Sequence, residues 1–169
     1  MTHVHPATRN GPAAQDGAPR MLPMTLVHLD DALRIEQGSY AFPWSRGNFI
    51  DSLAAGYWMQ VLRDADGGLV AYVVAMPGVE EMHLLNLTVA PHARRRGLAG
   101  LLLDALLAEC RRRAAATLWL EVRVGNHDAL ALYAARGFTE RGRRARYYPA
   151  ARGAREDAVV MALDLPAHD

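Results

Sequence analysis

Residues 92–100 join an apolar stretch to an apolar helical pattern and have the composition of a phosphate-binding loop. Three consecutive arginines precede Gly97-Leu98-Ala99-Gly100. Glycine and alanine leave backbone N–H groups unshielded at a helix start, where the helix dipole adds about half a positive charge. The spacing Arg-x-x-Gly-x-Ala is neither a Walker loop nor the dinucleotide-binding Gly-x-Gly-x-x-Gly. It therefore indicates a phosphate or pyrophosphate site of another kind, and the alternative is an ordinary strand-to-helix turn beside solvated arginines.

Further along the chain, Glu121 could accept a proton and Tyr133 could donate one. Glu121 lies in the apolar strand pattern of residues 117–124, where a partly desolvated carboxylate is a better proton acceptor near neutral pH. The alternative is an ion pair with Arg123 or with an arginine on the adjacent strand. Tyr133 follows on a predicted helix, and its phenol (ordinary pKa ~10) could protonate a thiolate (thiol pKa ~8.5) or simply pack at the edge of the core. Asn126, before that helix, is either a turn residue or a partner for an amide, since Asn offers both donor and acceptor.

Composition restricts the class of protein that carries these residues. The 169 residues are 51% hydrophobic and 22% charged, as expected for one globular domain with a substantial core. A net charge of +1 gives no general attraction to nucleic acid or anionic membrane. The single cysteine, Cys110, excludes an internal disulfide, and its apolar helix predicts a buried thiol. Without a secretory signal pattern or a run of ~18 apolar residues, we expect a cytoplasmic protein.

The chemistry-bearing residues need a mixed sheet with helices to position them. Residues 1–21 are rich in Ala, Pro, Gly and His and are predicted to be a disordered tail, because they bury too little apolar surface. Residues 22–169 are predicted to form a single domain. Apolar patterns predict helices over 30–39, 46–55, 98–113 and 129–135, and strands over 24–27, 57–62, 69–76, 84–89, 117–124, 138–146 and 158–163. This order predicts an α/β or α+β three-layer sandwich whose sheet is closed by the last strand.

Taken in order, these motifs resemble those of the GCN5-related N-acetyltransferases (GNAT). The resemblance is carried by residues 85–91, the Arg-x-x-Gly-x-Ala loop, residues 118–123, Asn126, Ala131-Leu132-Tyr133 and Gly137-Phe138. A narrower resemblance is to the bacterial ribosomal-protein-alanine N-acetyltransferases of the RimI type. It rests on Ala41-Phe42-Pro43-Trp44-Ser45, Tyr147-Tyr148-Pro149 and Glu156-Asp157-Ala158. Two departures from the family pattern are Ala99, where a glycine is commoner, and Arg146, where relatives often carry a smaller polar residue.

The resemblance implies a GNAT fold: a mixed, mostly antiparallel central sheet, helices on both faces and a splay between two central parallel strands. It implies an acyltransferase that uses acetyl-CoA as co-substrate without a metal and acetylates the N-terminal alanine of the eighteenth small-subunit ribosomal protein. Glu121 takes the position of the general base and Tyr133 that of the general acid. The implied cofactor-binding residues are Leu87, Thr88, Val89, Arg94, Arg95, Arg96, Gly97, Leu98, Ala99, Gly100 and Asn126. The implied walls of the acceptor site are Phe42, Trp44, Tyr147 and Tyr148.

Three other functions would explain part of the pattern. A related acetyltransferase could act on a lysine or a small amine. A non-catalytic acyl-CoA-binding module would need the cofactor loop alone, and the presence of both Glu121 and Tyr133 argues against it. The arginine clusters could suggest a nucleic-acid-binding module, but the net charge is nearly neutral and no motif of that kind occurs. We therefore expect no direct contact with nucleic acid or membrane.

Overall fold

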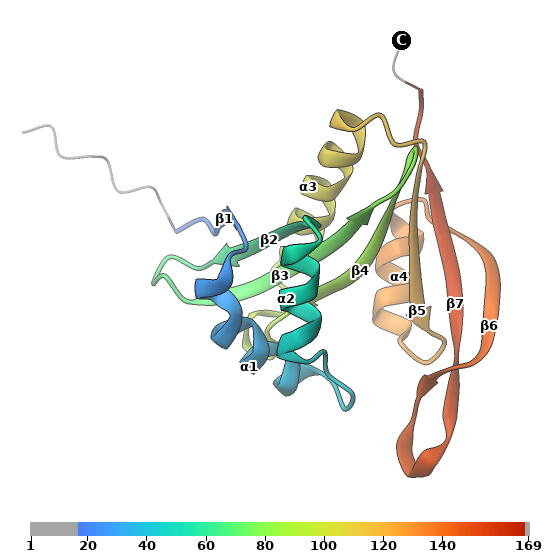
Figure 1. Cartoon of the computed structure of the whole chain (residues 1–169), viewed down its shortest axis with the longest axis horizontal. Coiled ribbons are helices and arrows are strands. Elements are labelled where there is room, and N and C mark those ends of the chain that lie inside the picture. Colours follow the sequence, from blue (N-terminus) through green and yellow to red (C-terminus); the bar gives the residue numbers. More distant parts are fainter. Residues whose placement is uncertain (1–16, 168–169) are drawn as a thin grey trace, which may run out of the picture.

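A seven-stranded mixed sheet forms the centre of the computed structural model, which describes residues 17–167 (Figure 1). Its strand order is β1-β2-β3-β4-β5-β7-β6. The strands are β1 (Arg20–Pro23), β2 (Trp58–Arg63), β3 (Leu69–Pro77), β4 (Glu81–Val89), β5 (Thr117–Arg123), β6 (Thr139–Pro149) and β7 (Arg155–Asp164). All neighbouring strands are antiparallel except β4 and β5, which are parallel. The predicted mixed, mostly antiparallel sheet is confirmed.

Four helices cover the two faces of this sheet: α1 (Leu29–Ser39), α2 (Arg46–Ala54), α3 (Leu98–Arg112) and α4 (His127–Ala135). In Figure 1, α1 and α2 lie over one face, and α3 and α4 over the other. Ser45 caps α2 by accepting a hydrogen bond from the N–H of Asn48, and Asn126 caps α4 by accepting one from Ala129. Short 3₁₀ turns occupy Leu26–His28, Pro91–Ala93 and Ala151–Gly153.

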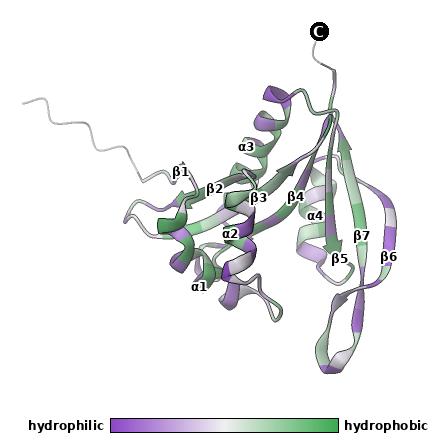
Figure 2. Cartoon of the chain, viewed as in Figure 1, coloured by the Kyte–Doolittle hydropathy of each residue, from purple (hydrophilic) through white to green (hydrophobic). Residues whose placement is uncertain are grey.

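The hydrophobic core lies on both sides of β3, whose residues 69–75 are all buried. Helices from both faces cover this strand, so its sequence reads as a continuous apolar run, and Figure 2 shows the strand as largely hydrophobic. Helix α3 buries one face against β3 and β4. That face carries Leu98, Leu102, Leu103, Leu106 and Cys110, each less than 4% exposed. The predicted burial of Cys110 is confirmed, and burial raises the pKa of its thiol to about 11.

The first predicted strand is wrong. Residues 24–27 do not pair, because after the Met24 N–H bonds to the Met59 carbonyl the chain turns into the 3₁₀ segment. Leu26 and Val27 are apolar but 66% and 80% exposed, so their character gave a false strand signal. The first strand is β1, in which Arg20 pairs with Arg63. The ordered domain therefore begins before residue 22, while residues 1–16 of the predicted tail lie outside the described residues.

The last predicted strand is present but does not close the sheet. β7 is inserted between β5 and β6, and β6 forms the edge. A tight connection through Ala151–Gly153 folds β7 back along β6, so that β7 pairs with β6 on one side and β5 on the other. No helix in the part of the chain that the structure describes is long and apolar enough to cross a membrane.

Candidate active site

The predicted splay between the two parallel strands is present. β4 and β5 are hydrogen-bonded only from Glu81/Thr117 to Leu84/Leu120, and the pairing ends there. At the same point β4 carries a bulge against β3, since Val74 pairs with Asn86 while Ala75 pairs with Leu84. Beyond this bulge, residues 85–89 of β4 have no partner strand on the β5 side. The separation of the two strands leaves room for two cavities, one on each side of the opening.

The first cavity, of about 960 Å³, contains nearly all of the predicted cofactor-binding residues. We call it the cofactor cleft. The predicted residues that line it are Leu87, Thr88, Val89, Arg94, Arg95, Gly97, Leu98, Ala99, Gly100 and Asn126. Arg96 is the one predicted cofactor-binding residue that does not line the cleft. Its guanidinium donates to both carboxylate oxygens of Asp64 at 2.8 and 2.9 Å, so its side chain ties the loop to the β2–β3 turn.

The start of α3 presents its first backbone N–H groups to this cleft. Gly97 is the N-cap residue, with φ +75° and no side chain capping the helix. A Cβ at Gly97 would meet no atom within 4 Å, so it would project into open space. At Gly100, by contrast, a Cβ would lie 2.5 Å from Nη2 of Arg136. The positive φ at residue 97 therefore favours glycine there, whereas at residue 100 only the flexible end of the Arg136 side chain occupies the space that a Cβ would need.

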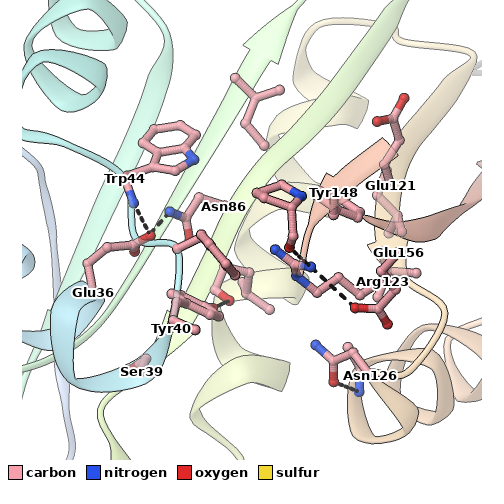
Figure 3. Close-up of a pocket in the computed structure, with 18 of the residues that line it drawn as sticks. Glu36, Ser39, Tyr40, Trp44, Asn86, Glu121, Arg123, Asn126, Tyr148 and Glu156 are labelled. Carbon is pink, nitrogen blue, oxygen red and sulfur yellow. Dashed lines mark hydrogen bonds and ion pairs between the residues drawn. The ribbon is translucent and has the colours of Figure 1, made fainter. Parts of the chain in front are cut away.

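The second cavity, of about 610 Å³, contains Glu121 and three of the four aromatic residues predicted for the acceptor site (Figure 3). We call it the acceptor cavity. Phe42 and Trp44 reach it from the α1–α2 connection, and Tyr148 from β6. Tyr147 does not line it, but its ring lies 4.9 Å from that of Tyr148. A two-residue irregularity between Arg144 and Tyr148 turns this end of β6 toward β5.

Tyr133 lines both cavities, as do Tyr40, Leu87 and Arg123. Its side chain is 7% exposed and packs on Phe138 with 5.5 Å between ring centroids. Burial, with smaller contributions from Tyr40 and Tyr148, raises the pKa of the Tyr133 hydroxyl well above its usual value. Tyr133 is therefore a neutral phenol at the point where the two cavities meet.

Glu121 is not an isolated carboxylate among apolar side chains. Its Oε1 lies 2.7 Å from Nε of Arg144, and its side chain remains 26% exposed. An ion pair is thus present, but its partner is neither Arg123 nor an arginine on an adjacent strand, because Arg144 reaches across β7 from β6. A hydrogen bond to the same carboxylate raises the pKa of the Tyr147 hydroxyl. Glu121 accordingly lines the acceptor cavity and is paired with Arg144.

Sequence reasoning missed an arginine–glutamate pair at the junction of the cavities. The Nη1 of Arg123 donates to the Pro149 carbonyl at 2.8 Å and to Glu156 at 3.2 Å, and its guanidinium lies 4.6 Å from the centre of the Tyr148 ring. Glu156 also accepts from the N–H of Gly125 at 2.8 Å. Burial raises the pKa of Tyr148 to about 12. Both charged residues stand inside motifs that carried the family resemblance, which was the only available signal.

A second missed feature is a buried carboxylate, Glu36, on the opposite wall of the acceptor cavity. It accepts hydrogen bonds from Trp44, Tyr72 and Asn86. No sequence motif marks it, because its partners are distant in the chain. No group of three or more His, Cys, Asp and Glu side chains within residues 17–167 is placed to hold a metal ion.

Comparison with known proteins shows the family of this chain. Residues 29–138 match the model of the acetyltransferase (GNAT) family. The bS18-alanine N-acetyltransferase of Salmonella typhimurium is 39% identical over 142 residues, which cover 84% of this chain and 95% of that protein. The enzyme of the same name from Escherichia coli strain K12 is 40% identical over 81% of this chain and 91% of its own length.

Solved structures agree with this assignment. The crystal structure of the ribosomal-protein-S18-alanine N-acetyltransferase from Escherichia coli superposes with a TM-score of 0.83 at 37% identity, covering 90% of this chain and 97% of that one. Ard1 from Thermoplasma volcanium shares the fold with a TM-score of 0.79 at 23% identity, covering 88% of this chain and 99% of that one. The GNAT fold expected from the sequence is confirmed.

Proposed function

The chain belongs to the GNAT family of acetyltransferases, and we propose that it transfers the acetyl group of acetyl-CoA to the N-terminal alanine of ribosomal protein bS18. Acetyl-CoA as co-substrate follows from the family. The alanine acceptor rests on the names of the relatives that are 39–40% identical. The observation that carries the proposal is the meeting of the cofactor cleft and the acceptor cavity at Tyr133.

Open backbone N–H groups and two arginines in the cofactor cleft support acetyl-CoA as its ligand. Its pyrophosphate would lie at the start of α3, where no side chain occupies the first backbone N–H groups and Gly97 leaves an open approach. Arg94 and Arg95 line this end of the cleft. The pantetheine arm would run along residues 85–89 of β4, whose backbone has no partner strand on the β5 side, and bring the thioester to Tyr133.

On the acceptor side, Glu121 is the proposed general base. A peptide α-amine has a pKa of ~7.7–8.0 and is largely protonated at neutral pH, so it must lose a proton before it can attack. Glu121 would take that proton directly or through one water. A lysine amine, at ~10.4, would be protonated far more completely, which favours a peptide N-terminus as the acceptor.

Tyr133 is the proposed acid for the leaving group. As the amine nitrogen bonds to the acetyl carbon, the carbon–sulfur bond breaks and the sulfur gains a negative charge. The phenol of Tyr133 then gives its proton to the sulfur, the attacking nitrogen releases its extra proton to solvent and becomes the neutral amide, and the phenol is reprotonated from solvent. The raised pKa of this hydroxyl keeps the donor proton in place before the reaction and disfavours a lasting tyrosinate.

Acetyl transfer to synthetic peptides tests the acceptor assignment. We would measure kcat/KM for a peptide that begins with Ala and contains one internal lysine, for its N-terminally blocked form, and for a version that begins with a bulky residue. We expect acetylation only of the free N-terminus, with the Ala peptide preferred because Phe42, Trp44 and Tyr148 leave space for a small side chain. Faster acetylation of the lysine in the blocked peptide would overturn the assignment.

A further inference from the structure

Glu36 is an ionisable side chain in a place where charge is unfavourable. It belongs to the last turns of α1, is 2% exposed and lines the acceptor cavity (Figure 3). Within residues 17–167 no arginine or histidine forms an ion pair with it. An unpaired carboxylate is tolerated in a protein interior only when hydrogen-bond donors surround it. Its surroundings therefore indicate what it holds in place.

Both oxygens of Glu36 are occupied by donors that the fold supplies. Oε1 accepts from the backbone N–H of Trp44 at 2.9 Å. Oε2 accepts from Nδ2 of Asn86 at 3.1 Å and from the hydroxyl of Tyr72. Trp44 stands at the end of the connection that leads into α2, whereas Tyr72 and Asn86 belong to β3 and β4. One carboxylate thus joins a surface connection to two central strands.

The network continues from Asn86 to the other end of the same connection. Oδ1 of Asn86 accepts from the Thr88 hydroxyl at 2.7 Å, and that hydroxyl lies 2.7 Å from the hydroxyl of Tyr40. Residues 40–44, which we call the acceptor loop, are therefore tied to β4 at both ends. Phe42 lies between the two ties and is 47% exposed, and its ring lies 5.8 Å from the guanidinium carbon of Arg123.

We propose that Glu36 is a positioning residue that fixes the acceptor loop against β4 and thereby sets the affinity for the acceptor peptide. The inference rests on the proposed function, because it assumes that Phe42 and Trp44 contact the acceptor. Glu36 does not act as the base, since its oxygens face donors that cannot move away. Glu121 has no backbone donor on its carboxylate and takes that role.

The variant Glu36→Gln separates positioning from proton transfer. The glutamine amide has the shape of the carboxylate but only one acceptor oxygen. Its NH₂ group faces a donor and cannot accept a hydrogen bond, so either the Trp44 side or the Asn86 side of the bridge is lost. We expect KM for the Ala peptide to rise about tenfold, the effect of losing roughly 1.4 kcal/mol of binding. We expect kcat at saturating peptide and the calorimetric Kd for acetyl-CoA to stay within about twofold, a shift below roughly 0.5 kcal/mol.

Matched variants make each outcome decisive. Tyr72→Phe removes a donor from the other oxygen and leaves the Trp44 contact, so it should lower the melting temperature without raising the peptide KM. A Glu36→Gln enzyme whose lost kcat recovers at high pH would instead make Glu36 the base and overturn the proposal. Equal peptide KM values for Glu36→Gln and wild type would also overturn it.

Two measurements cover the remaining cases. If Glu36→Gln does not fold, Tyr40→Phe cuts the tie at the exposed end of the loop and should raise the peptide KM several-fold; no change would overturn the proposal.

If the wild type does not acetylate Ala peptides, the proposed acceptor fails first, and hydrogen exchange at the Trp44 amide tests the tie alone. Protection of that amide in wild type, and its loss in Glu36→Met, whose side chain has no oxygen to accept the bond, is expected; an unprotected amide in wild type would exclude the tie.

Discussion

Arg144 and Glu121 form an ion pair of 2.7 Å that reaches from β6 to β5 across the intervening strand β7. The arginine side chain is 57% exposed, so solvent screens the pair and its net contribution to stability is about 0–1 kcal/mol. A weak pair of this kind orients the carboxylate without preventing proton transfer. Glu121, which lines the acceptor cavity, is thus held by a partner that water or substrate can displace.

Replacing Glu121 with Gln should remove the base and keep the shape of the site. We expect kcat/KM for the Ala peptide at pH 7 to fall by about 10²-fold or more, the usual contribution of general base catalysis. The loss should shrink as pH rises past ~8, because the α-amine then deprotonates without help. The measurement is a pH–rate profile of both enzymes.

Arg144→Gln is the control for that experiment. It breaks the same ion pair but leaves the carboxylate, so it should keep most of the activity at pH 7. If Arg144→Gln and Glu121→Gln lose the same activity with the same pH profile, the role of Glu121 is confined to the ion pair.

Tyr133→Phe tests the proton donor. The ring still packs on Phe138, so fold and acetyl-CoA affinity should be kept, while kcat falls by about 10²-fold if proton donation limits the rate. Single-turnover kinetics with saturating peptide would measure the chemical step directly. Wild-type rates in that assay would assign Tyr133 a packing role only.

Gly97→Val tests the placement of the pyrophosphate. The backbone at residue 97 has φ +75°, which strains a branched residue, and the new side chain would fill the open approach to α3. Calorimetry should show CoA affinity reduced by about tenfold or more, equivalent to at least roughly 1.4 kcal/mol. Arg96→Ala is the comparison, because that side chain binds Asp64, and we expect its CoA affinity to be nearly unchanged. Unaltered CoA affinity in a folded Gly97→Val protein would place the phosphates elsewhere.

The buried tyrosines predict a loss of stability in alkali. Burial raises the pKa values of Tyr72, Tyr133 and Tyr148 above the ordinary value of 10.0. Above pH 10 the unfolded chain has released these protons while the native protein still binds them, so the free energy of unfolding falls as pH rises. Each group contributes up to about 1.4 kcal/mol per pH unit in that range. Urea unfolding between pH 8 and 11 should show a shallower decline in Tyr72→Phe than in wild type, and parallel curves would contradict this.

Local patterns predicted much of this molecule, and contacts between distant segments account for the rest. The phosphate loop was recognisable because a helix start and its glycines are adjacent in sequence. The sequence did not indicate which of the three arginines turns away from the cofactor cleft. Arg96 does so because it binds Asp64, which belongs to the neighbouring β2–β3 hairpin. The Glu36 network likewise joins residues 36, 72 and 86, and no periodicity encodes such a meeting. The position of β7 inside the sheet depends on which strands it pairs with, and the residues of a strand carry little information about its partners.

The interior position of β7 sets an order for the appearance of activity during protein synthesis. Residues 29–138, which match the GNAT family model, contain the whole of α3 and the loop before it, and they leave the ribosome first. Within residues 17–167 β6 pairs with no strand other than β7, so the strand that carries Tyr147 and Tyr148 has no hydrogen-bonded neighbour until residues 155–164 have been made. A nascent chain can therefore form α3 and the loop before it early, but the edge strand that carries Tyr147 and Tyr148 gains its strand partner only when β7 is made.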